Sequence, residues 1–106
     1  MQISIRTCSA TDSPTVQRFT TRRLRTATLR LAHRLRDVEV DVSRESPREG
    51  GRYVCRIRGT LAGGGTVLIK RDDKDARHAI ASSVERFRRS LVRTLGRRSR
   101  LHETDG

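Results

Sequence analysis

The sequence predicts an α+β fold with the element order β-α-β-β-β-α, in which a four-stranded mixed sheet carries two long helices packed on one face. Two segments repeat apolar residues every three or four positions, and four shorter segments alternate apolar with polar residues. The length of 106 residues allows one small domain. A strand, a helix and a strand in succession are expected to form a right-handed crossover between parallel strands, followed by an antiparallel meander. We expect a single domain over residues 1–96 and a basic, then polar, disordered tail over residues 97–106.

Two long amphipathic helices are predicted. The first is expected to begin at Thr11–Pro14, which offers an N-cap followed by a proline at the first helical position, and to end near residue 35. Its apolar face comprises Val16, Thr20, Leu24, Ala27, Leu31 and Leu35. Asp72 or Asp73 is expected to cap the second helix. The apolar face of that helix comprises Ala76, Ile80, Val84, Phe87, Leu91 and Leu95, after which the pattern is lost.

The four predicted strands are short. They are marked by Ile3 and Ile5, by Val38, Val40 and Val42, by Tyr53, Cys55 and Ile57, and by Val67 and Ile69. Residues 46–51 are typical of a turn, and Gly63–Gly65 of a hairpin between the third and fourth strands. Glu39 and Asp41 are expected to lie opposite Arg56 and Arg58, so that cross-strand pairing neutralises much of the open face of the sheet.

That open face carries no predicted platform for base stacking. Single-stranded RNA readers that use a sheet need aromatic side chains on its surface. The outward positions here are Val54, Arg56, Arg58, Leu68 and Lys70, and the aromatic residues Phe19, Tyr53 and Phe87 lie at or near predicted core positions. Recognition of structured RNA through its shape and backbone is therefore favoured.

The charge balance points to a polyanionic partner. Lys and Arg number 24 against 12 Asp and Glu, which leaves a net charge of +12. Such an excess costs self-repulsion in the unpartnered chain. All the cations except Lys70 and Lys74 are arginines. Arginine suits bidentate phosphate contacts, although the codon usage of a GC-rich genome would also favour it over lysine.

The predicted helices hold most of this surplus. Arg86, Arg89, Arg93 and Arg97 fall on one face of the second helix, opposite its apolar positions. Glu85 lies four positions before Arg89, and Asp73 lies only near the start of the helix. With so few acidic partners, the guanidinium groups repel one another until an anion binds. The alternative is an ordinary solvated helix surface. The first helix repeats the arrangement less regularly, with Arg18, Arg22, Arg25 and Arg36 opposite its apolar face, Leu29 interrupting them, and Arg23, Arg30 and Arg34 on its flanks.

Enzymatic chemistry finds little support in the sequence. Gly63–Gly65 is not followed by the Gly-Lys-Ser/Thr of a phosphate-binding loop. Three aspartates resemble the carboxylate clusters that hold magnesium in nucleases, but a helix start explains acidic residues through capping and the helix dipole. The aspartates are Asp72, Asp73 and Asp75. The histidines are dispersed along the chain, at His33, His78 and His102. We expect no enzyme activity, metal, cofactor or small-molecule substrate.

Cys8 and Cys55 are too few for a disulfide framework and lack zinc spacing, so both are expected to be free thiols. No apolar run is long enough to span a membrane, and the start of the chain lacks the pattern of a signal peptide. A cytoplasmic location without membrane contact is therefore expected.

The element order, together with several local motifs, resembles the ribosome hibernation promoting factor family, also called ribosome-associated inhibitors or sigma-54 modulation proteins. The motifs are Gly63–Gly65, Asp75, Ala79–Ile80 and the run Val84–Leu91, and the resemblance covers about residues 1–98. With nothing after residue 106, the chain resembles the short type. It departs from the family at two places. This chain has Asp75-Ala76-Arg77 where the family commonly has Asp-Met-Tyr, and it has Ala27-Thr28 where the family often has Leu-Glu.

This resemblance implies a stress-response protein that is not an enzyme and that binds the small ribosomal subunit. Its ribosomal RNA contacts would lie between head and body and overlap the messenger and transfer RNA sites, so that translation stops. Family basic positions carry over to Arg23, Arg86, Arg89, Arg93 and Arg97. Periodicity adds Arg18 and Arg22 to the expected RNA-binding set, and whether ribosomes pair into dimers is left open.

The sequence therefore predicts a translation inhibitor that docks its helical face on small-subunit ribosomal RNA. Two alternatives remain open at this point. One is a generic binder of double-stranded nucleic acid, and the other is a basic interaction module for an acidic protein partner. A magnesium-dependent nuclease is the least favoured option.

Overall fold

The computed structural model describes residues 1–7, 14–45 and 51–105, with side chains described through Arg97. The chain forms β1 (Gln2–Thr7), α1 (Pro14–Ala27), a short 3-10 helix η1 (Ala32–Arg34), β2 (Leu35–Glu45), β3 (Arg52–Leu61), β4 (Thr66–Asp73) and α2 (Ala76–Asp105). The predicted N-cap residues 11–13, Cys8 and the turn residues 46–50 lie outside the described residues.

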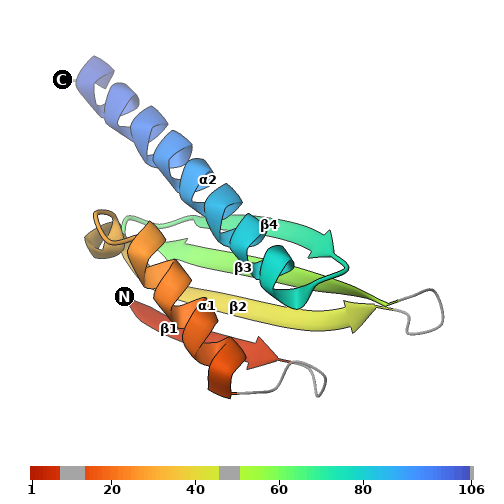
Figure 1. Ribbon diagram of the computed structural model, residues 1–106. Coiled ribbons are helices and arrows are strands. Elements are labelled where there is room, and N and C mark those ends of the chain that lie inside the picture. The colour runs from red at the N-terminus through yellow and green to blue at the C-terminus, as the bar shows by residue number, and fades with distance from the viewer. Residues whose placement is uncertain (8–13, 46–50, 106) are drawn as a thin grey trace.

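The strands form one sheet in the order β1-β2-β3-β4, and both helices lie on the same face of it (Figure 1). β1 pairs with β2 in parallel, with Ile3 opposite Val38, while the other two pairings are antiparallel. The predicted α+β fold and element order are thus confirmed. Gly64 and Gly65 adopt φ angles of 95° and 92° in the predicted hairpin between β3 and β4.

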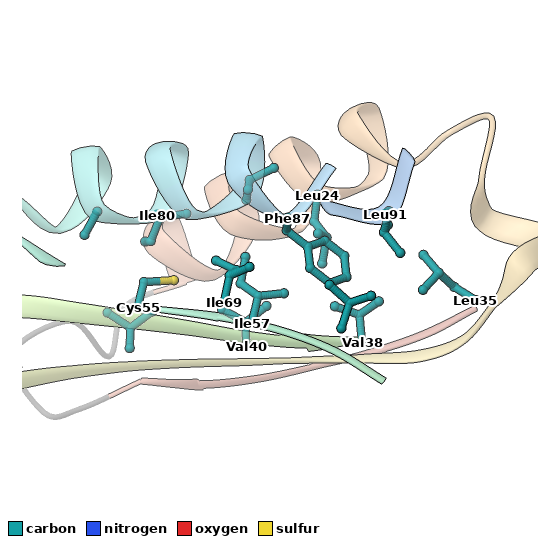
Figure 2. Packing of buried hydrophobic residues seen from close by; sticks show 14 of the residues in the cluster. Leu24, Leu35, Val38, Val40, Cys55, Ile57, Ile69, Ile80, Phe87 and Leu91 are labelled. Atoms are coloured by element: carbon teal, nitrogen blue, oxygen red, sulfur yellow. The ribbon is translucent and has the colours of Figure 1, made fainter. Parts of the chain in front are cut away.

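The core fills the space between the helices and the inner face of the sheet (Figure 2). Phe87 of α2 and Leu24 of α1 are fully buried there against Val38 and Val40 of β2 and Ile57 of β3. Burying a large apolar side chain contributes about 1.5–3 kcal/mol, so this layer supplies most of the stability of the small domain. It also fixes α1 and α2 beside one another.

α1 ends at Ala27, whereas the spacing of apolar residues predicted a helix to about residue 35. The hydroxyl of Thr28 donates to the carbonyl of Leu24 at 2.7 Å, and the amides of Leu31 and Arg34 donate three residues back, in tight turns. Leu35 then opens β2 opposite Leu61. The apolar spacing continued past the helix because the turns and the strand also face the core.

This earlier end moves several arginines off the predicted helix face. Arg36 lies in β2, Arg34 in η1 and Arg30 in the turn between α1 and η1. Leu29 lies in the same turn, so it does not interrupt a helical stripe.

Both ends of α2 differ from the prediction. Asp72 and Asp73 belong to β4, and the cap is Asp75, whose Oδ1 accepts the amides of Arg77 at 2.8 Å and His78 at 3.2 Å. At the other end the helix continues through Asp105 and projects past the sheet (Figure 1). The apolar pattern stops at Leu95 because the packing surface ends there, not because the helix does.

The open face of the sheet has the predicted register but not the predicted ion pairs. Glu39 lies opposite Arg58 and Asp41 opposite Arg56, yet among the described residues no ion pair within 4.0 Å joins them. Val54 was expected to be outward and open, but it is 1% exposed. Leu68 is 67% exposed on this face.

None of the helices in the described part of the chain combines the length and the apolar character that crossing a membrane requires.

Gly59→Ala is expected to lower the free energy of unfolding by about 1–3 kcal/mol, because the added carbon would force the buried Phe87 ring to shift. A Cβ built on Gly59 lies 2.5 Å from Cζ of Phe87. Chemical denaturation measures the effect. Gly96→Ala is the matched control, since a Cβ there meets nothing within 4 Å, and it should stabilise the protein by about 0.5–1 kcal/mol. Unchanged stability of the Gly59 variant would show that the ring does not pack as described.

Candidate nucleic-acid interface

A groove runs between α1 and α2 on the outer side of the helical layer. It consists of three hollows in a row, and Thr26 lines all of them. Arg23 lines both the first and the middle hollow, while Ala27 and Arg88 line both the middle and the last. We call it the inter-helix groove. Its basic lining is Arg18, Arg22, Arg23, Arg30, Arg77 and Arg88, and its acidic lining among the described residues is Glu85. Positive charge from both helices therefore converges on one concave surface.

Phe19 holds two of these arginines at one end of the groove. The guanidinium carbon of Arg23 lies 5.5 Å from the centre of the Phe19 ring, and that of Arg77 lies 5.4 Å from it. Both distances are within the range of cation–π attraction. The phenyl ring therefore gathers charge from α1 and α2, and a nucleobase would have to displace an arginine to stack on it.

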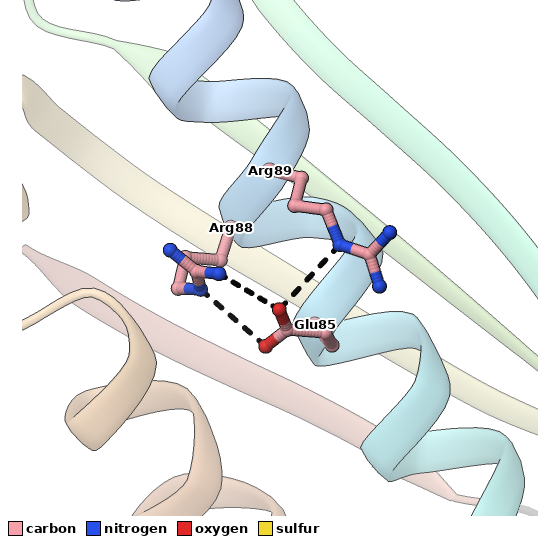
Figure 3. A network of polar contacts seen from close by, with 3 residues as sticks. All are labelled: Glu85, Arg88 and Arg89. Atoms are coloured by element: carbon pink, nitrogen blue, oxygen red, sulfur yellow. Dashed lines mark hydrogen bonds and ion pairs between the residues drawn. The ribbon is translucent and has the colours of Figure 1, made fainter.

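Glu85 partly neutralises the middle of α2 (Figure 3). Its Oε1 lies 2.8 Å from Nη2 of Arg88 and 3.5 Å from Nε of Arg89, while Arg88 Nε also donates to Oε2 at 3.4 Å. The hydrogen bond from Arg88 holds the pKa of Glu85 below its ordinary value, so the carboxylate stays ionised at neutral pH. One carboxylate thus serves two guanidinium groups, on side chains that are 41% and 61% exposed, and such solvated pairs are weak enough for phosphates to compete.

The second basic surface is the outer stripe, which we define as Arg86, Arg89, Arg93 and Arg97 of α2. At about 100° per residue these side chains fall within about 80° of one another, as the sequence predicted. All four are exposed, and of them Arg89 alone forms an ion pair among the described residues. None of them lines the inter-helix groove.

The predicted site residues thus divide between two surfaces. Arg18, Arg22 and Arg23 lie in the groove, and the four stripe residues lie on the other flank of α2. In Figure 3, Arg88 and Arg89 leave the helix on different sides. The buried strip of α2 separates the two flanks, because Arg77 and Arg88 project about 100–120° from Ala76 while the stripe projects about 220–300° from it.

Sequence reasoning missed Arg77 and Arg88 as groove residues. Both border the apolar strip of α2 on its groove side. Arg88 lines the same hollow as Val84 and Ala81, and Arg77 lines the hollow around Phe19. Periodicity places them at this border, but it does not say on which side of α2 the first helix lies. The handedness of the β1-α1-β2 crossover carries that information, since such connections are right-handed in nearly all proteins.

The three aspartates near the start of α2 have structural partners. Asp72 binds Arg52 at 2.7 Å, Asp73 accepts the amide of Asp75 at 2.9 Å, and Asp75 caps the helix. The Arg52 hydrogen bond lowers the pKa of Asp72, and the His78 amide lowers that of Asp75. Across the described part of the chain, no three His, Cys, Asp or Glu side chains lie together as a metal site would require.

Comparisons with known proteins bear on the fold. No family model matches the chain, and no curated protein matches it in sequence. Among solved structures it is similar to the crystal structure of the Thermus thermophilus Protein Y N-terminal domain, with a TM-score of 0.73 and 19% sequence identity. The match covers 89% of this chain and 99% of that one. The chain shares the fold of the Protein Y N-terminal domain. This likeness shows the fold alone, and it says nothing of which side chains act.

Cys55 is a free thiol in the core and a poor nucleophile. It is buried beneath α2, where the hydroxyl of Ser83 donates to the Cys55 carbonyl at 3.4 Å. Burial raises the pKa of this thiol to about 11. The reactive species is the thiolate, so Cys55 is inert at neutral pH.

In a Cys8→Ser variant, Cys55 is expected to react with a thiol reagent at pH 8 only as fast as the protein unfolds. The neutral thiol is preferred in the folded state, so its contribution to stability is complete below the pKa of an unfolded cysteine and is lost as the pH rises toward 11. Labelling followed by mass spectrometry, with and without denaturant, measures the rate. Rapid labelling of the native protein would mean that the thiol is accessible.

Proposed function

We propose that this protein is a ribosome hibernation-type factor that binds ribosomal RNA of the small subunit through its helical layer. It acts in the cytoplasm under stress, covers the messenger and transfer RNA sites, and has no enzymatic activity. The observation that carries the proposal is the convergence of arginines from both helices on the inter-helix groove, with the outer stripe beside it.

The fold supports a ribosomal partner. The chain has the architecture of the N-terminal domain of Protein Y from Thermus thermophilus, and the family that its sequence resembles is one of ribosome-binding proteins. The local motifs that resemble the hibernation family lie on this shared architecture, at the hairpin Gly63–Gly65 and along α2. A fold alone leaves the function open, so the proposal depends on the surface charges as well.

The charges favour phosphate contacts. Guanidinium groups bind phosphate oxygens in bidentate geometry, and neutralising a polyanion releases its condensed counterions. The groove and the stripe flank one helix, so α2 can lie along structured RNA with basic side chains on each side. Binding would also relieve the repulsion within a chain that carries +12.

The same surfaces disfavour reading of base sequence. Phe19 is the aromatic residue of the groove, and Arg23 and Arg77 already occupy its ring. The described open face of the sheet presents Arg56, Arg58 and Lys70 instead of aromatic side chains. Without stacking platforms, recognition rests on the shape and backbone of folded RNA.

Removal of three charges from either helical surface is expected to weaken ribosome binding at least tenfold. The stripe variant changes Arg86, Arg89 and Arg93 to Gln, and the groove variant changes Arg23, Arg77 and Arg88 to Gln. Co-sedimentation with small subunits measures the affinity, and thermal unfolding checks that the fold is intact. The matched control changes three exposed cations of the open sheet face to Gln, namely Arg56, Arg58 and Lys70.

That control loses the same net charge, so it should bind almost as the unchanged protein does. Equal loss in all three variants would indicate attraction by net charge alone. Equally strong competition by a naked RNA duplex would favour a generic binder of double-stranded nucleic acid.

Salt is expected to weaken binding steeply. If five to seven phosphates are neutralised, the slope of log K against log salt concentration is about −4 to −6. The groove and stripe variants should each flatten it by about 2, since each lost phosphate contact removes about 0.7–0.9. Binding titrations at salt concentrations from about 50 to 300 mM give this slope. A slope near zero would contradict phosphate contacts.

A further inference from the structure

The turn after α1 and the middle of α2 together form an apolar hollow at one end of the inter-helix groove. Its apolar lining is Leu29, Leu31, Ala27 and Val92, and its rim carries Arg30 and Arg88. Leu29 is 75% exposed and Val92 is 51% exposed. Two of the large apolar side chains that this protein exposes therefore meet at one place, although they are far apart in sequence.

Leu29 is held in place and not carried on a loose loop. The Thr28 hydroxyl bonds the Leu24 carbonyl at 2.7 Å, and the Leu31 amide donates to the Thr28 carbonyl at 2.9 Å. These bonds fix the turn on both sides of Leu29. Exposed apolar side chains that lie together mark interaction sites more often than isolated ones do, and Leu29 and Val92 line the same hollow.

Phosphate does not account for this hollow, because an anion gains nothing from aliphatic carbon. A nucleobase is also a poor occupant. Bases are held by stacking on planar side chains, and this lining has no aromatic ring. Its two planar groups are the guanidinium groups of Arg30 and Arg88, and Glu85 already binds that of Arg88. An apolar side chain of a protein fits such a lining.

We propose that this hollow docks a protein segment that presents an apolar side chain flanked by carboxylates. The apolar group would cover Leu29 and Val92, one carboxylate would face Arg30, and a second would share Arg88 with Glu85. A second copy of the chain is disfavoured, since each copy carries +12. The hollow is continuous with the groove through Thr26, Ala27 and Arg88. The inference rests on the proposed function in one respect: the segment belongs to a ribosomal protein that lies beside the bound RNA.

Site-specific photo-crosslinking on the small subunit tests the inference. Leu29→p-benzoylphenylalanine and Val92→p-benzoylphenylalanine are expected to crosslink to one ribosomal protein, at a peptide that contains apolar and acidic residues. The matched control is Leu68→p-benzoylphenylalanine, because Leu68 is similarly exposed but lies on the open face of the sheet. It should give no such crosslink.

Affinity measurements give a second readout. The double change Leu29→Ala and Val92→Ala is expected to weaken binding to small subunits about tenfold without changing the salt slope, because apolar contacts release no counterions. Leu68→Ala should leave the affinity unchanged.

The outcomes separate this inference from the proposed function. If the protein co-sediments with small subunits but positions 29 and 92 crosslink to RNA, or to nothing, the docking surface is overturned. The proposed ribosomal role is unaffected by that result. Unchanged affinity of the double variant also overturns it. Failure of the unsubstituted protein to co-sediment overturns both.

Discussion

The contact between the two helices and one face of the sheet determines where the arginines of the helical layer lie. Phe87 and Leu24 are buried over the strands, and Gly59 leaves room for the Phe87 ring. With both helices on the same face, their polar sides point outward together and their facing flanks enclose a groove. A chain with the same composition but helices on opposite faces would spread its arginines over the whole surface.

The helical layer and the open sheet face differ in how acidic residues are distributed. On the sheet, Glu39 and Asp41 lie in register with Arg58 and Arg56. Along the groove, Glu85 is the carboxylate that faces a set of arginines from both helices. The open sheet face is therefore suited to solvent, and the groove is suited to an anion.

The sequence predicted what depends on local periodicity. The order of elements, the strand register at Glu39 and the shared direction of the outer stripe follow from periods of two and 3.6 residues. The end of α1 was wrong because Leu31 and Leu35 keep a helical spacing while serving a turn and a strand. The roles of Arg77 and Arg88 depend on which flank of α2 meets α1, and that is a tertiary property. The hollow at Leu29 likewise needs two segments to be brought together in space.

We propose that the helical layer, and not the open sheet face, meets ribosomal RNA. A cryo-EM map of the protein on the small subunit tests it most directly. We expect phosphate density next to α2 on both its flanks, with Arg58 and Leu68 turned away from RNA. A map in which the sheet contacts RNA while the groove faces solvent would contradict it.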